Sequence, residues 1–151
     1  MKHFQNLIEA DAEMQYGDLA FVRCRPYTKA RILGTRRDNG ETEREDLLFL
    51  LDTGGQHCRI DLTLPFLQDW NTGKLDFGKE TGLGGMTTQT SLVTEEYRLM
   101  FGKTENKKPL FKCQPKFTWS KRNIIGSKIF HQLRVVLKVD YHSEIIELIK
   151  M

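Results

Sequence analysis

Apolar and polar residues alternate along most of the second half of the chain. Four short segments show this pattern, and their apolar members are Tyr97, Leu99 and Phe101; Phe111 and Cys113; Phe117 and Trp119; Val135, Leu137 and Val139. Successive side chains of a strand point to opposite faces, so a repeat of two predicts half-buried antiparallel strands. We expect a short helix over residues 126–133 and a last strand over residues 144–149.

The first half of the chain is predicted to begin with a helix and to continue with strands. Apolar residues in the opening segment follow roughly helical spacing, so we expect residues 1–17 to be an N-terminal extension with a short amphipathic helix. Residues 18–24 and 27–33 are predicted strands, separated near Pro26. The remaining residues, 18–151, contain no visible linker or repeat, which indicates one compact, mainly β domain.

Two further patterns complete the first half. Residues 34–45 are polar, and Asp38-Asn39-Gly40 within them predicts the turn of a hairpin. Residues 47–51 are five large apolar residues in a row, which is typical of a strand buried on both faces. After them, Thr63 with Pro65 two residues on predicts a helix cap followed by one or two helical turns.

Composition narrows the class of protein without naming a function. Of the 151 residues, 39% are hydrophobic and 28% are charged, as in an ordinary soluble globular protein. No apolar run is long enough to span a bilayer, and the first residues lack the pattern of a signal peptide, so we expect a cytoplasmic protein with no membrane partner. Three scattered cysteines fit a reducing compartment.

The residues with the most chemical information follow the apolar run directly. Asp52 comes at the end of the predicted buried strand, before Thr53, Gly54 and Gly55. A carboxylate at such a place has to be explained by its surroundings, because burying an unpaired charge is costly. An Asp-Thr-Gly triplet by itself is also a common turn, so two other segments carry the rest of the interpretation.

The first of these segments is rich in glycine. Gly82, Leu83, Gly84 and Gly85 lie between polar residues and a β-like run. They form either an ordinary hairpin loop or a mobile flap that closes over an extended peptide. The second segment is Asn123-Ile124-Ile125-Gly126, which leads into the predicted short helix.

The order and spacing of these segments resemble the retropepsin-like aspartic peptidase family. The resemblance runs from about residue 18 to residue 149 and is carried by Leu50-Leu51-Asp52-Thr53-Gly54, by the glycine-rich segment and by Asn123-Ile124-Ile125-Gly126. It implies a single-lobe acid-protease barrel with a glycine-rich flap hairpin and one short C-terminal helix. It also implies an aspartic-type endopeptidase, a hydrolase that needs no cofactor and no metal.

The resemblance assigns roles to individual residues. With only one Asp-Thr-Gly motif in the chain, an active enzyme is implied to be a homodimer in which the catalytic Asp52 of each copy shares a proton with the other. Thr53 and Gly54 support the site. An extended peptide or protein substrate is bound by the residues of the two glycine-containing loops, namely Gly54, Gly55, Gln56, Gly82, Leu83, Gly84 and Gly85.

The sequence departs from the family at the positions that brace the site. Retroviral members often carry acidic residues where this chain has Gln56 and His57, and an arginine after the second glycine where it has Ser127 and Lys128. An ionic brace between these positions is therefore absent, and a dimer has to rely on other contacts. For this reason a catalytically silent dimerisation or peptide-binding module of the same fold is the main alternative.

Three other chemistries fit the residues less well. His57 and Cys58 are adjacent, so a strand directs them to opposite faces, which is unsuitable for a metal site or for a thiol with a histidine base. A nucleic-acid surface is suggested by aromatics among lysines near residues 111–121, but alternation is expected to place the aromatics inside and the lysines outside. Basic and acidic residues are also interleaved, which is typical of a solvated surface around a net charge of +3, so we expect no nucleic-acid partner.

Overall fold

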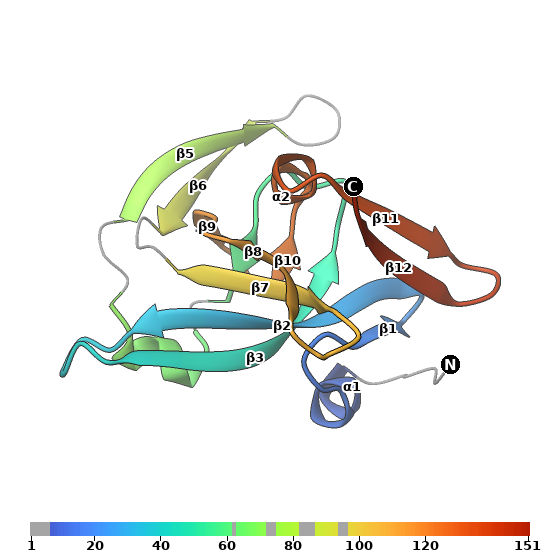
Figure 1. Cartoon of the computed structure of the whole chain (residues 1–151). Coiled ribbons are helices and arrows are strands. Elements are labelled where there is room, and N and C mark those ends of the chain that lie inside the picture. The colour runs from blue at the N-terminus through green and yellow to red at the C-terminus, as the bar shows by residue number, and fades with distance from the viewer. Residues whose placement is uncertain (1–6, 62, 72–74, 82–86, 94–96) are drawn as a thin grey trace.

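Figure 1 shows the computed structural model of the chain, which is mainly β. It describes residues 7–61, 63–71, 75–81, 87–93 and 97–151, and for residues 75–81 and 87–93 it describes the backbone alone. The helices are α1 (Leu7–Glu13), the 3-10 helix η1 (Pro65–Asp69) and α2 (Ser127–Gln132). The strands are β1 (Leu19–Val22), β2 (Arg25–Thr35), β3 (Thr42–Leu51), β4 (Arg59–Ile60), β5 (Leu75–Thr81), β6 (Thr87–Val93), β7 (Arg98–Lys103), β8 (Pro109–Cys113), β9 (Phe117–Trp119), β10 (Ile124–Ile125), β11 (Val135–Asp140) and β12 (Ile145–Lys150).

Ten of these strands form one sheet, which curls into a half-barrel (Figure 1). Its order is β5-β6-β9-β4-β10-β3-β2-β7-β8, with β1 on the same edge of β2 as β7. The strands β11 and β12 form a separate two-stranded hairpin, labelled at the right of Figure 1. The mainly β class and the single short C-terminal helix that the sequence predicted are therefore confirmed.

The strands β2 and β3 are the longest strands of the sheet. They pair antiparallel from Tyr27↔Leu50 to Thr35↔Thr42, and the turn between them contains Gly40 at φ 71°. The hairpin predicted at Asp38-Asn39-Gly40 is confirmed, although the strands extend further into the polar segment than expected. Charged residues on an exposed strand face permit this, because the ladder needs only backbone groups.

The turn between β1 and β2 lies at a different place from the one expected. Pro26 is part of β2, opposite Phe21, and the turn is made by Arg23 and Cys24, which have φ angles of 51° and 64°. The proline was a misleading signal because β1 ends at Val22, and proline is tolerated near the start of a strand. The helix expected in the extension is present as α1, and residues 1–6 lie outside the described residues.

The apolar run of β3 separates two hydrophobic clusters. Phe49 and Leu51 belong to the main core, whereas Leu50 belongs to a smaller cluster with Ala10 and Met14 of α1. Residues on a strand alternate between its faces, so a continuous apolar run supplies both clusters at once. The prediction of a strand buried on both faces is confirmed by the burial of these last three residues of β3.

Two local predictions were wrong in detail. The helical turn after residue 63 is present as η1, but Leu64 and not Thr63 occupies the cap position, because the Thr63 hydroxyl donates instead to Asp61 Oδ1 at 2.5 Å. Trp119 was expected to face the core with Phe117, yet it is 45% exposed. The strand β9 has only three residues, and Trp119 is the last of them.

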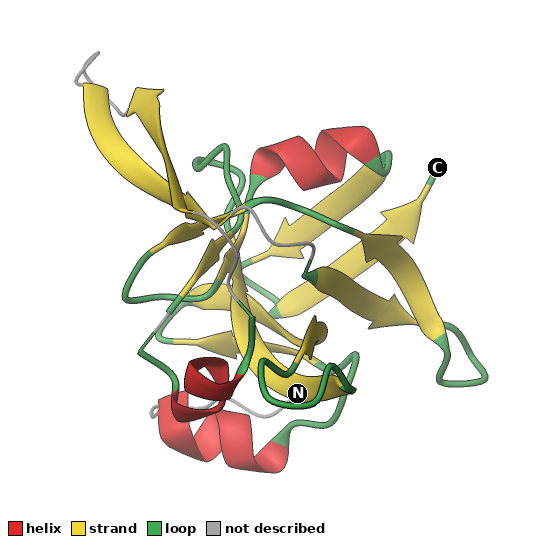
Figure 2. Ribbon diagram, turned by 90° about the vertical axis from the view of Figure 1, so that its left-hand side faces the viewer, coloured by secondary structure: helices red, strands yellow, loops and turns green. Residues whose placement is uncertain are grey.

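The strands β5 and β6 form an antiparallel hairpin with register from Leu75↔Val93 to Thr81↔Thr87. In both views the hairpin and α2 lie at the same end of the molecule (Figures 1 and 2). The residues expected at the tip of a flap, Gly82, Leu83, Gly84 and Gly85, lie outside the described residues. No helix in the described part of the chain is long and apolar enough to cross a membrane.

Candidate active site

Asp52 is the first residue after β3, at a point where the chain crosses over a neighbouring strand. The short strand β10 lies between β3 and β4, parallel to the first and antiparallel to the second. The loop that joins β3 to β4 therefore passes around the end of β10. The Asp52 backbone N–H donates to the Ile125 carbonyl oxygen at 3.1 Å, which continues the β3–β10 ladder up to the carboxylate-bearing residue.

Asp52 as a residue is half-buried, and its carboxylate is oriented by its own loop. Its Oδ1 accepts a hydrogen bond from the Gly54 N–H at 2.9 Å. This is an Asx-turn, in which an aspartate side chain binds the backbone N–H two residues further along the chain. A Cβ placed on Gly54 would lie 3.2 Å from Oδ1, and one placed on Gly55 would lie 3.6 Å from Oδ2. Glycine at both positions therefore leaves open space beside the two carboxylate oxygens.

The outer half of the loop is held by the start of α2. The Ser127 N–H donates to the Gly55 carbonyl oxygen at 2.7 Å, and the Lys128 N–H donates to that of Gln56 at 3.1 Å. The first N–H groups of a helix have no partner within the helix, so they are free to bind a loop in this way. These two backbone hydrogen bonds, which we call the backbone clamp, join the positions at which an ionic brace between side chains was considered from the sequence.

Gly126 makes this clamp possible. A Cβ at this residue would lie 2.4 Å from the carbonyl oxygen of His57, which is closer than two such atoms approach. Its φ of −92° is accessible to any residue, so glycine is required here for space and not for backbone freedom. The requirement is specific to the packing of two loops that are far apart in the sequence.

Two residues of the loop have side chains that are exposed to solvent. Thr53 and Gln56 are exposed, and Gly55 is half-buried. In the described part of the chain, the Gly54 N–H is the hydrogen-bond donor to the Asp52 carboxylate, and the Thr53 hydroxyl makes no hydrogen bond. The structure thus brings together the carboxylate and the glycines predicted for the first loop, and the four residues predicted for the flap lie outside the description.

Cys58 is a buried, unreactive thiol. Its side chain is 2% exposed, and burial raises the pKa of the thiol to about 11. Cys113 is similar, because burial raises the pKa of its thiol to about 12. Thiols that stay protonated at neutral pH are poor nucleophiles. Among the described residues, no three His, Cys, Asp or Glu side chains gather as a metal site would require.

The aromatic residues near the lysines of β8 and β9 do not form one platform. Phe111 and Phe117 are buried, whereas Lys112 and Lys116 are exposed. Trp119 is the exception, as described above. Stacking of bases needs several exposed aromatic faces, and these two phenylalanines do not offer theirs.

Sequence reasoning identified Asp52 and its glycines but missed what holds them. It treated Ser127 and Lys128 as side chains that fail to match an ionic brace, whereas their backbone N–H groups bind the loop. The predicted helix directly after Gly126 was the available signal, since a helix start supplies free N–H groups. No model of a known protein family matches the chain, and no curated protein matches it.

Proposed function

We propose that the protein is an aspartic endopeptidase of retropepsin-like fold that acts as a homodimer. The observation that carries the proposal is the Asp52 carboxylate, oriented by the Gly54 N–H in a loop that passes around β10 and is clamped by α2. Such a construction holds one carboxylate firmly and leaves open space beside it.

A second copy of the chain supplies the missing half of the site. One carboxylate cannot act as both the base and the acid in peptide hydrolysis, and this chain has a single Asp-Thr-Gly motif. A two-fold axis beside Asp52 brings the two carboxylates together with identical surroundings. The exposed Thr53 hydroxyl is then available to bond across to the partner's loop and hold the pair in register.

Two close carboxylates share one proton, because ionising both would place like charges side by side. The ionised Asp52 takes a proton from a water molecule, whose oxygen attacks the carbonyl carbon of the scissile peptide bond. The protonated partner donates a hydrogen bond to the carbonyl oxygen and stabilises the charge that develops on it. Transfer of a proton to the amide nitrogen then lets the C–N bond break, giving a free acid and a free amine.

An extended peptide is the substrate that fits this arrangement. The Gly54, Gly55 and Gln56 segment borders the carboxylate and lacks bulky side chains at its two glycines, so a substrate backbone has room to approach. The β5–β6 hairpin stands at the same end of the molecule as α2 (Figure 1). In the proposal, Gly82, Leu83, Gly84 and Gly85 close over the substrate as a flap and exclude water.

Replacement of Asp52 by asparagine is the direct test. The amide oxygen of Asp52→Asn still accepts the Gly54 N–H, so the loop keeps its shape while the base is lost. We expect cleavage of an unfolded protein by the wild type, rising more than linearly with enzyme concentration as dimers form. We expect cleavage to fall at least about a thousandfold in the variant, since a general base contributes factors of this order.

Asp140→Asn is the matched control, because Asp140 Oδ1 accepts the His142 N–H at 3.0 Å in a turn of the same kind. It should retain full activity. If the wild type cleaves nothing at high concentration from acidic to neutral pH, yet forms dimers, the catalytically silent module is the better description. The uncharged Gln56 and the Ser127-Lys128 pair, in place of an ionic brace, are the observations that favour this alternative.

A further inference from the structure

A concave region lies beside α1, the helix labelled at the bottom of Figure 1. We call it the basic groove. It has a volume of about 650 Å³ and is formed by α1, the β1–β2 turn, β3 and the loops before η1 and β10. None of its lining residues belongs to the Asp52 loop, so it is separate from the candidate active site.

Four cations stand around the basic groove. They are Arg23 of the β1–β2 turn, Arg25 at the start of β2, and Lys121 and Arg122 of the loop before β10, and all four are exposed. Among the described residues, none of these four side chains makes a hydrogen bond or an ion pair. The groove therefore presents positive charge that the described part of the chain does not neutralise.

The two carboxylates that line the groove are engaged elsewhere. Asp11 forms an ion pair with Lys29, whose side chain is only 10% exposed. Asp61 Oδ1 accepts hydrogen bonds from the N–H of Thr63 at 2.9 Å and from its hydroxyl. Neither acid is paired with the four cations, so the local excess of positive charge remains.

The turn that carries Arg23 is unusual for its residues. Arg23 and Cys24 both have positive φ angles, 51° and 64°, in a two-residue hairpin turn. Asparagine and glycine are the favoured residues in such a turn, because other side chains are strained there. An arginine is thus held at the rim of the groove in a backbone conformation that other residues would adopt more easily.

The floor of the groove is aliphatic. It is lined by Val22, Leu48 and Leu64, and on the α1 side by Leu7 and Ile8, which are 36% and 80% exposed. An anion alone would gain nothing from such a floor. Val22 is already fully buried, but a ligand with apolar groups beside its negative charges would cover the exposed surface of Leu7, Ile8, Leu48 and Leu64 and meet the cations at the same time.

We propose that the basic groove binds an acidic, amphipathic peptide segment of a partner protein. Apolar side chains of the segment would lie on the aliphatic floor, and its carboxylates would pair with the four cations. Nucleic acid fits less well, because among the described lining residues Tyr27 is the one aromatic and it is only 9% exposed, so these residues offer bases no face on which to stack.

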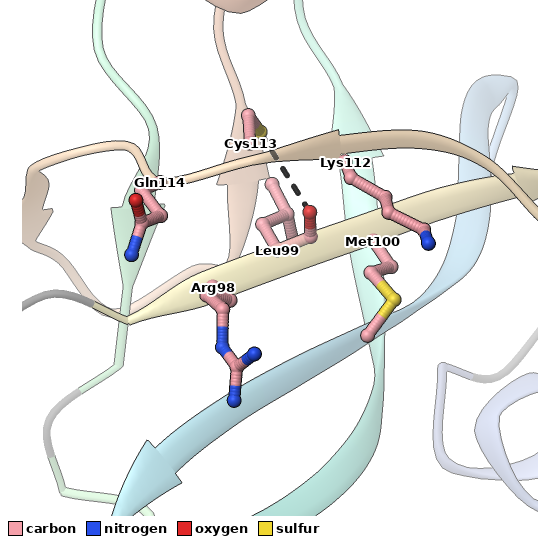
Figure 3. Close-up of a pocket in the computed structure, with 6 residues that line it drawn as sticks. All are labelled: Arg98, Leu99, Met100, Lys112, Cys113 and Gln114. Carbon is pink, nitrogen blue, oxygen red and sulfur yellow. Dashed lines mark hydrogen bonds between the residues drawn. The ribbon is translucent and has the colours of Figure 1, made fainter.

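A second basic depression on the molecule provides an internal comparison. It lies on β7 and β8 and has a volume of about 330 Å³, with Arg98, Lys112 and Gln114 at its border (Figure 3). It is formed by two neighbouring strands and the residue that follows them, without the converging loops and helix of the basic groove. It matches the groove in having positive charge, but it lacks the enclosing elements.

Binding is measured with a fluorescent peptide in which leucines at helical spacing are separated by aspartates and glutamates. The protein used is the full chain carrying Asp52→Asn, so that the peptide stays intact and the outcome does not depend on peptidase activity. We expect saturable binding at moderate salt that weakens as salt is added. Lys121→Glu/Arg122→Glu should lower the affinity at least about tenfold.

Two further variants make the result specific. Lys112→Glu/Lys116→Glu carries the same change of charge outside the groove and should leave the affinity within about twofold. Arg23→Asn should weaken binding without lowering the melting temperature, because asparagine relieves the strained turn. A purely structural role for Arg23 would instead lower the melting temperature and spare the binding.

The proposal is overturned by any of three outcomes. The acidic peptide shows no saturable binding; the two double variants weaken binding equally; or a peptide with serines in place of leucines, or a single-stranded oligonucleotide, binds as tightly as the probe. The last outcome would identify a general polyanion surface in place of a peptide site.

Discussion

The two ends of β3 are joined to loops that are held in different ways. The turn before the strand, between β2 and β3, is stabilised by its own charged side chains. Arg36 donates to Asp38 at 2.8 and 2.9 Å and to Glu43 Oε1 at 2.7 Å, and the other oxygen of Glu43 accepts the indole N–H of Trp70 at 3.1 Å. The side chains of this turn are thereby committed to one another.

The loop after the strand, which carries Asp52, is held by backbone groups. Its carbonyl oxygens at Gly55 and Gln56 accept N–H groups from the start of α2, and its close contact is with Gly126. Its exposed side chains take no part in this support. The difference shows how a protein frees side chains for chemistry: backbone atoms of a distant segment hold the loop, so the exposed side chains of Thr53 and Gln56 are not needed for its support.

The largest effect should come from filling the contact that only glycine permits. Gly126→Ala places a Cβ against the His57 carbonyl oxygen, and we expect the free energy of unfolding to fall by about 3 kcal/mol. Gly40→Ala is the control, because nothing lies within 4 Å of its Cβ and only its φ of 71° is unfavourable, a cost of about 1 kcal/mol. Equal losses in urea denaturation would show that the Asp52 loop is not clamped as described.

Acidification should separate the two loops. Hydrogen bonds from Arg36 hold the pKa values of Asp38 and Glu43 below their usual range. Their stabilisation is therefore fully present above the pKa of the unfolded carboxyls and is lost as the pH falls through the lower folded values. We expect the Gly40 amide to lose hydrogen-exchange protection in that window, while the Ser127 amide keeps it.

In Arg36→Met the pH dependence of the turn should become much weaker, because the group that lowers both pKa values most is gone, while the Trp70 indole N–H still lowers that of Glu43. The Asp52 loop should be unaffected in this variant. Loss of protection at both loops together on acidification would contradict the distinction between side-chain and backbone support.

The smallest effect should come from the exposed threonine of the Asp52 loop. In dilute protein, Thr53→Ala should change the free energy of unfolding by less than about 0.5 kcal/mol, because its hydroxyl makes no hydrogen bond in the described chain. Thr28→Ala is the contrast, since Thr28 is fully buried and its hydroxyl donates to the Asp18 carbonyl oxygen at 3.1 Å. It should cost about 1 to 2 kcal/mol in the same denaturation experiment.

Much of the fold was predictable because it depends on local pattern. Alternation marked β7, β8 and β11, and the five apolar residues of β3 indicated a strand buried on both faces. The turn at Asp38-Asn39-Gly40 followed from residue preferences alone. Predictions from local residue preference were wrong where tertiary packing decided the outcome. Pro26 lies inside β2 instead of in a turn, and Trp119 is exposed instead of buried.

The sequence by itself therefore determined the longer strands of the main sheet, such as β2, β3 and β7, together with the helix α2 and the placing of Asp52 at the end of a buried strand, since each depends on residues close together along the chain. Only the tertiary structure decided that β10 lies between β3 and β4, and that the N–H groups of Ser127 and Lys128 bind the Asp52 loop. These contacts join segments about seventy residues apart through backbone atoms, which every residue has, so side-chain patterns carry no record of them.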